Sequence, residues 1–274
     1  MSADGATIVS ASFDKTLKVW DGFSGVERLT LRGHTGWVDD CAVSADGATI
    51  VSASSDGTLK VWDGRSGAER FILSGHAGVA RDCAVSADGA TIVSASFDQT
   101  LKVWDGRSGA ERFTLSGHAG GVNDCAVNTD GGTIVSASDD RTLKVWDGHT
   151  GAERLTLTGH AAGVIGCAVS ADGATIVSAS SDQTLKVWDG RSGVERFTLS
   201  GHTRGVNSCA VSADGAMIVS ASWDQTVKVW DGRTGECLST LHVDGPLYSC
   251  SCSADGEIIA AAGPRGIYFL RFVR

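Results

Sequence analysis

The stretch Thr-Leu-Lys-Val-Trp-Asp at residues 58–63 decides the fold, because it recurs along the chain at a constant spacing. It ends in a Trp-Asp pair, which occurs six times, 42 residues apart, from Trp20-Asp21 to Trp230-Asp231. The segments between these pairs are nearly copies of one another. A repeat of this length is one supersecondary unit that buries its apolar face by stacking on its neighbours. The chain is therefore an array of equivalent units.

Each repeat contains four short apolar stretches separated by turns. The repeat 33–74 predicts strands at residues 38–44, 49–54, 58–62 and 69–73, which we name a, b, c and d. Asp-Gly pairs between them, such as Asp46-Gly47, are strong hairpin signals. A period of 40 to 45 residues with four strands and a terminal Trp-Asp is typical of one β-propeller blade. We therefore expect an all-β propeller of four-stranded antiparallel blades.

The strand count predicts the number of blades. Residues 1–5 match residues 43–47, so the chain begins inside a repeat and contains six a, seven b, seven c and six d strands. This predicts a seven-bladed ring, one domain over residues 1–274, whose seam between the last and first blades is incomplete. The first blade lacks strand a, and the divergent closing blade at 243–274 lacks strand d. A six-bladed ring is the alternative, and it leaves two strands unplaced.

The incomplete seam has two expected consequences. Unpaired strand edges promote association between chains, so we expect self-association there. The two missing strands also suggest that the chain is a fragment of a longer protein.

Composition narrows the function classes. The net charge is −9, and phosphate neutralisation by Lys and Arg dominates nucleic-acid binding, so we expect no nucleic-acid partner. The sequence shows no apolar run of membrane-spanning length and no signal peptide, so we expect no membrane partner and a cytoplasmic location. Six of the eight Cys residues share one repeat position, and we interpret them as small buried apolar residues in a reducing compartment rather than metal ligands.

The motifs Gly-His, Ser-Ala-Asp-Gly and Ser-x-Asp-x-Thr-Leu-Lys-Val-Trp-Asp, at this period, resemble those of the WD-repeat β-propellers over nearly the whole chain. The resemblance implies a tetrad of His, Ser or Thr, Asp and Trp inside each blade. In the second blade these are His34, Ser52 or Ser54, Asp56 and Trp62. The corresponding His, Asp and Trp of the next four blades are His76, Asp98 and Trp104; His118, Asp140 and Trp146; His160, Asp182 and Trp188; and His202, Asp224 and Trp230.

A His-Asp-Ser set also suggests catalysis. Each of several copies would need an exposed nucleophile and an oxyanion hole, whereas mutual hydrogen bonding is enough to explain the tetrads. We therefore predict that the tetrads are structural, that the chain is not an enzyme, and that it needs no cofactor and no metal.

The near-identical repeats and the closing residues 242–247 and 266–270 resemble a narrower group. They are similar to the C-terminal propellers of bacterial signal-transduction NTPases and of bacterial WD-repeat kinases. That resemblance implies a sensor or recruiting role, with the chemistry performed by another domain. The phosphate-binding pattern GxxxxGK[ST] does not occur in this sequence.

The repeats differ mainly at two places, the b–c turn and the loop that precedes strand a. Both are expected at one end of the disc, whereas the turns of the opposite end are nearly uniform. Aromatic residues and Arg are the side chains that anchor protein interfaces. The predicted anchors of a partner-binding face are Phe13, Trp37, Arg81, Phe97, Asp139, Arg141, Arg204 and Trp223.

These observations predict a non-catalytic scaffold or sensor module that binds a protein partner. Neutral drift of surface loops is the simplest alternative for the variation. A glycan or small-ligand binder would use similar sites in every blade with avidity. An engineered or isolated repeat array without a function of its own would show the same near-identity of repeats.

Overall fold

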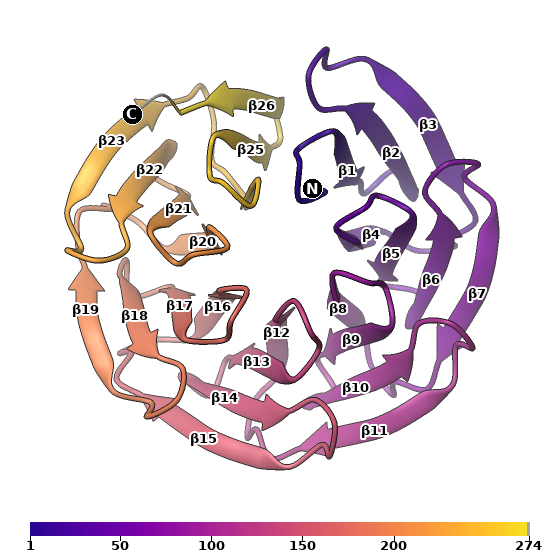
Figure 1. Cartoon of the computed structure of the whole chain (residues 1–274), viewed down its shortest axis with the longest axis horizontal. Helices are drawn as coiled ribbons and strands as arrows, with labels where there is room; N and C mark the ends of the chain where they lie inside the picture. The colour runs from indigo at the N-terminus through magenta and orange to yellow at the C-terminus, as the bar shows by residue number, and fades with distance from the viewer. Residues whose placement is uncertain (273–274) are drawn as a thin grey trace.

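The computed structural model describes residues 1–272 and consists of seven antiparallel sheets arranged as blades around a central axis (Figure 1). The predicted seven-bladed propeller is confirmed, and the six-bladed alternative is wrong. Blades 2 to 6 have four strands each, whereas the first and last blades have three. No helix that is long and apolar enough to cross a membrane occurs within residues 1–272.

Strands are numbered along the chain, and within each blade they run from the axis to the rim (Figure 1). Blade 1 contains β1 (Thr7–Ala11), β2 (Thr16–Asp21) and β3 (Glu27–Arg32). Blade 2 contains β4 (Val38–Val43), β5 (Thr49–Ser54), β6 (Thr58–Asp63) and β7 (Glu69–Ser74). Blade 3 contains β8 (Ala80–Val85), β9 (Thr91–Ser96), β10 (Thr100–Asp105) and β11 (Glu111–Ser116). Blade 4 contains β12 (Val122–Val127), β13 (Thr133–Ser138), β14 (Thr142–Asp147) and β15 (Glu153–Thr158).

The remaining blades follow the same order. Blade 5 contains β16 (Val164–Val169), β17 (Thr175–Ser180), β18 (Leu185–Asp189) and β19 (Glu195–Leu199). Blade 6 contains β20 (Val206–Val211), β21 (Met217–Ser222), β22 (Thr226–Asp231) and β23 (Cys237–His242). Blade 7 contains β24 (Ser249–Cys252), β25 (Ile258–Gly263) and β26 (Gly266–Arg271). The predicted strand ends of blade 2 differ from the observed ones by at most one residue, and strand b agrees at both ends.

The core is divided into layers between neighbouring blades. In one layer, Val61 and Leu73 of blade 2 pack against Trp104 of blade 3, and the Trp is 3% exposed. The same set recurs 42 residues further along the chain, where Val103 and Leu115 pack against Trp146. Because each blade covers its predecessor with the same side chains, one repeat sequence is enough to specify the whole stack.

The ring is closed near the axis by hydrogen bonds between successive a–b turns. The Ala3 N–H donates to the Ala45 carbonyl at 3.1 Å, and the Ala254 N–H of blade 7 donates to the Ala3 carbonyl of blade 1 at 2.9 Å. Within each of blades 1 to 6 the c–d turn also approaches the a–b turn closely. A Cβ on Gly64 would lie 2.0 Å from the Gly47 carbonyl oxygen, so this contact requires glycine.

The six cysteines that share one repeat position are free thiols. Cys83, Cys125, Cys167, Cys209 and Cys250 are buried, while Cys41 in blade 2 is half-buried. Burial raises the pKa of the Cys250 thiol to about 12, which keeps it protonated and unreactive. Cys237 differs from these residues because it is exposed at the start of β23.

Candidate interaction surface

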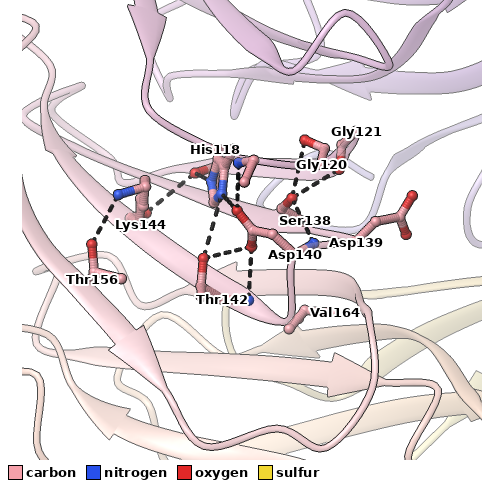
Figure 2. A network of polar contacts seen from close by, with 12 residues as sticks. His118, Gly120, Gly121, Ser138, Asp139, Asp140, Thr142, Lys144, Thr156 and Val164 are labelled. Atoms are coloured by element: carbon pink, nitrogen blue, oxygen red, sulfur yellow. Dashed lines mark hydrogen bonds and ion pairs between the residues drawn. The ribbon is translucent and has the colours of Figure 1, made fainter.

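The tetrad of blade 4 consists of His118, Ser136, Asp140 and Trp146, and Figure 2 shows its His118 and Asp140 together with Thr142. The Trp146 indole N–H donates to the Ser136 hydroxyl at 2.9 Å. That hydroxyl donates to His118 Nε2 at 2.8 Å, and the His118 Nδ1–H donates to Asp140 Oδ2 at 2.8 Å. The Thr142 hydroxyl donates to the other carboxylate oxygen at 2.6 Å. The chain of donors fixes one histidine tautomer and satisfies each polar side-chain atom that it links.

The same connections occur in blades 2 to 6. In blade 2 the serine of the tetrad is Ser52 rather than Ser54, because His34 and Trp62 both contact the Ser52 hydroxyl. Blade 1 has the shorter connection from Trp20 to Ser10 at 2.9 Å.

The charges and the burial of the tetrad favour a structural role. Burial lowers the pKa of His118, so the imidazole is neutral at pH 7. Burial opposes ionisation of Asp140, but hydrogen bonds from Thr142, Ala119 and His118 lower its pKa to about 2. The Ser136 side chain is 0% exposed. A serine nucleophile must reach its substrate, and this one has no access to solvent.

In blades 2 to 6 the b–c turn is hydrogen-bonded to the loop before strand a of the same blade. The Ser55 N–H donates to the Trp37 carbonyl at 2.9 Å, and the Trp223 N–H donates to the Gly205 carbonyl at 3.2 Å. The two loop types that vary most between repeats therefore lie together at one end of the disc. We call this end the variable face.

The predicted anchors on the variable face are exposed. Phe13 is 62% exposed, Trp37 56%, Phe97 46% and Trp223 51%. Arg81, Asp139, Arg141 and Arg204 are exposed as well. Large apolar side chains at these exposures leave a substantial area that a partner can bury.

Five residues of blades 1 to 3 form two contact groups on the variable face, which we together call the blade 1–3 cluster: Phe13 with Trp37, and Asp39 with Arg81 and Phe97. The Phe13 and Trp37 rings are 5.3 Å apart. Arg81 Nη1 donates to Asp39 Oδ1 at 3.0 Å, and its guanidinium carbon lies 5.6 Å from the Phe97 ring. Asp139 and Arg141 belong to blade 4, and Arg204 and Trp223 to blade 6. The eight predicted residues thus share a face, and among them the contacts pair Phe13 with Trp37 and Arg81 with Phe97.

Within the blade 1–3 cluster, Asp39 has a buried carboxylate whose two oxygens are not both hydrogen-bonded. Its side chain is 5% exposed, and Oδ2 is buried without a partner among the described residues. Burial raises the pKa of this carboxyl despite the nearby Arg81. The equivalent Asn123 and Asn207 instead donate to carbonyls of the next blade, at Val164 (3.0 Å) and Leu247 (2.6 Å). The Asn side chains are thus satisfied by the next blade, whereas the buried Oδ2 of Asp39 carries an uncompensated desolvation cost.

Sequence reasoning missed two features. Tyr248 is 49% exposed and is the equivalent of Asn207 in the last blade. It comes one residue earlier than the 42-residue period predicts, because the last repeat is one residue shorter. An alignment of the last repeat that allows for this one-residue deletion would have identified Tyr248. The second feature is a row of acids on the innermost strands, Asp40, Asp82 and Asp124. Burial and the neighbouring carboxylates raise the pKa of Asp82, and burial raises that of Asp124 to about 7.

The repeats match a known family. The family model described as "WD domain, G-beta repeat" matches six segments of the chain, residues 1–21, 25–63, 67–105, 109–147, 151–189 and 193–231. The chain belongs to the WD-repeat family. Its seventh blade lies outside the matched segments, in agreement with the loss of Trp-Asp and of the Gly-His pair there. WD-repeat propellers are commonly protein-interaction scaffolds without catalytic activity.

Proposed function

We propose that this WD-repeat propeller is a non-catalytic interaction module that binds a protein partner through the variable face. The single observation that carries the proposal is the blade 1–3 cluster. It combines two exposed aromatic side chains in contact, Phe13 and Trp37, with an exposed Arg81 that lies over Phe97. Aromatic side chains and Arg contribute most of the binding energy in protein interfaces.

The rigid framework supports this use of the face. The loops are held by backbone hydrogen bonds and by the tetrads beneath them, so little conformational entropy is lost on binding. Asp39 also supports partner binding through the variable face. A buried carboxylate oxygen without a partner lowers stability, and this is more typical of a functional surface than of a surface optimised for stability. As a sensor or scaffold, the module would place its partner relative to other domains of a signalling protein.

A repeated glycan or ligand site is less consistent with the surface. Such a site needs the same side chains in each blade. The turn position before the tetrad Asp carries Phe13, Ser55, Phe97, Asp139, Ser181 and Trp223 in successive blades.

The test is a comparison of three proteins as baits in quantitative affinity capture from a native extract. They are the wild type, a face variant with Trp37→Ala, Phe97→Ala and Trp223→Ala, and a control with Phe23→Ala, Arg107→Ala and Arg191→Ala in the opposite turns. We expect partners that the wild type and the control enrich and the face variant loses. Each exposed anchor should contribute about 1–2 kcal/mol, so the triple variant should weaken binding more than 100-fold.

Thermal denaturation establishes that the face variant is folded. Equal enrichment by the face variant and the wild type would contradict the proposal. Loss of enrichment in the control but not in the face variant would place the binding site at the opposite end of the disc.

A further inference from the structure

Five exposed aromatic side chains of the variable face come from five blades that follow one another around the ring. Blades 6, 7, 1, 2 and 3 are consecutive there (Figure 1). Their b–c turns and the loops before strand a carry one such residue each, 46–62% exposed: Trp223, Tyr248, Phe13, Trp37 and Phe97. The equivalent positions of blades 4 and 5 hold none: Gly121, Asn123, Asp139, Gly163, Ile165 and Ser181. We call the five aromatic residues the aromatic arc.

In blades 1 to 3 the members of the aromatic arc are held by contacts between blades. The Phe13 ring lies against Trp37, and the Phe97 ring lies beside the Arg81 guanidinium. A Cβ on Gly121 of blade 4 would lie 2.9 Å from the Phe97 ring, so this ring rests on backbone that has no side chain. The three aromatic rings are therefore supported by their neighbours while a large part of each stays exposed.

In blades 6 and 7 backbone contacts bring two further members together. The Leu247 N–H donates to the Ser222 carbonyl at 3.1 Å. Tyr248 and Trp223 directly follow these two residues in the sequence. Asn207 Nδ2 also donates to the Leu247 carbonyl, at 2.6 Å. The loop that carries Tyr248 is thus fixed to the turn that carries Trp223.

The same turns and loops carry exposed cations that lack an acidic partner. Lys15 lies two residues after Phe13, Arg204 precedes β20, and Arg265 lies in the b–c turn of blade 7. All three are exposed, and none of them forms an ion pair among residues 1–272. Arg81 pairs with Asp39 through one of its five N–H groups, and its side chain is 43% exposed.

The carboxylates in these turns and loops are fewer at the surface. The exposed ones are Asp14, which accepts from the Thr16 hydroxyl at 2.7 Å, and Asp244, which accepts from the Tyr268 hydroxyl. The tetrad carboxylates of blades 2, 3 and 6 are 5–13% exposed, and each is hydrogen-bonded by its His and Thr: Asp56, Asp98 and Asp224. The exposed charges along the aromatic arc are therefore mainly positive, although the chain has a net charge of −9.

We propose that the segment bound by this surface is an acidic peptide in extended conformation, an inference that rests on the proposed function and names the chemistry of its partner. Apolar side chains of the peptide cover the aromatic arc, and its Asp and Glu carboxylates pair with the four cations beside the arc: Lys15, Arg81, Arg204 and Arg265. Carboxylate–guanidinium contacts are charge-assisted and often bidentate, so they fix the register of the peptide. An extended peptide fits because the anchors are spread over five blades and do not surround one pocket.

A single-stranded nucleic acid is the other ligand that uses aromatic side chains together with cations. It fits this protein less well. Each nucleotide adds a negative charge, so a long phosphate backbone is repelled by a chain of net charge −9. A peptide needs only as many carboxylates as the surface has cations. The acidic peptide is therefore the better match.

The probe is a phage-displayed library of random 12-residue peptides. It is selected on the wild-type protein and counter-selected on the face variant with Trp37→Ala, Phe97→Ala and Trp223→Ala. We expect enrichment of Asp and Glu together with Phe, Trp or Leu. The best peptide, labelled with fluorescein, should bind saturably in fluorescence anisotropy and more weakly at high salt. Its analogue with Asn and Gln in place of Asp and Glu should bind at least tenfold more weakly.

Protein variants locate the site. Lys15→Gln and Arg204→Ala introduce the residues that other blades have at these positions, Gln99 and Ala162, so the fold is preserved. Each should weaken binding of the acidic peptide about fivefold, and Tyr248→Ala should weaken it about tenfold. The matched controls are Arg107→Ala and Phe23→Ala in the turns of the opposite face, which should leave the affinity unchanged.

Three results would overturn the acidic-peptide proposal. The first is a selection that enriches no acidic residues. The second is an affinity for the acidic peptide that the double variant Lys15→Gln/Arg204→Ala does not change. The third is a 12-nucleotide oligothymidylate that binds more tightly than the peptide and is lost in Tyr248→Ala.

The affinity-capture comparison separates this proposal from the proposed function. If the face variant loses the partners from the extract while the selected peptides are neutral or basic, only the acidic chemistry is wrong. If the face variant captures the same partners as the wild type, the proposed function itself is wrong.

Discussion

Single residues of the variable face adopt an unfavourable backbone conformation. The residue after the tetrad Asp has a positive φ in each of blades 1 to 6, and it is glycine only at Gly57 (φ 81°). The others are Lys15, Gln99, Arg141, Gln183 and Gln225, with φ between 70° and 75°. For a residue with a Cβ this conformation costs about 1–2 kcal/mol. Five long polar side chains are thus held on the face at a cost in stability.

Gln183→Gly should therefore stabilise the protein. The gain is the conformational penalty less the extra backbone entropy that glycine loses on folding, or about 0.5–1 kcal/mol. Urea denaturation measures it, and Gly57→Gln is the matched reverse change, which should reduce stability by a similar amount. A loss of stability in Gln183→Gly would mean that the side chain makes contacts worth more than the strain.

The acids of the innermost strands should make stability depend on pH. Burial and the carboxylates of Asp124 and Asp40 raise the pKa of Asp82 above its ordinary 3.8, so the folded chain holds its proton to higher pH than the unfolded chain. Stability then falls as pH rises from about 4 through the raised pKa. Asp82→Asn removes the ionisable group and keeps an acceptor for the Cys125 N–H, which Asp82 accepts at 2.8 Å.

We expect Asp82→Asn to be more stable than wild type at pH 8 by about 1–2 kcal/mol, with the difference shrinking toward pH 4. The measurement is the free energy of unfolding at several pH values. Asp139→Asn is the control, since it removes the same charge from an exposed position. A constant difference across the pH range would contradict the assignment to Asp82.

At the scale of elements, β23 departs most from the repeat. All six of its residues are exposed. Cys237 replaces the Glu that pairs with Lys60 at 2.5 Å in blade 2, so Lys228 contacts Thr240 instead. Ser239 replaces the Phe or Leu found at this position in blades 1 to 5. The outer edge of blade 6 is therefore less well packed than the other rims.

Ser239→Phe should restore that packing. The ring would enter the groove beside Leu241 and Leu270 and bury apolar surface, which we expect to raise the free energy of unfolding by about 1 kcal/mol. Ser239→Asp is the control and should not stabilise. If both variants unfold at the same urea concentration, the groove does not accept the ring.

The strands and their order could be predicted because period and turn signals are local properties of each repeat. The row formed by Asp40, Asp82 and Asp124 could not, because it depends on which way strand a faces after the bulge between Val38 and Asp40. The exposure of Leu241 could not either, since the same Leu is buried in five other blades. It depends on what the next blade lacks, which is a property of the assembled ring.

At the scale of the whole molecule, the seven blades are not equally supported. Blades 3 to 5 have a complete blade on each side, whereas blades 1 and 7 meet where strand a of one and strand d of the other are missing (Figure 1). In repeat proteins stability is approximately a sum over repeats and their interfaces. We expect native-state hydrogen exchange to show opening of blades 1 and 7 at lower free energy than blades 3 to 5. Uniform opening free energies would show that the ring unfolds as one unit.

The hydrogen bond from Ala254 to Ala3 closes the ring near the axis, while the rim at the same junction remains open. The ring is therefore continuous on its inner side and interrupted on its outer side at this one junction. We therefore expect this junction to bend more easily than the interfaces between the other blades. A strand bound at the rim of this junction would make the outer side continuous as well and would hold blade 1 more rigidly against blade 7. Phe13 belongs to blade 1, so the rigidity of the variable face around Phe13 depends on what binds at the rim between blades 1 and 7.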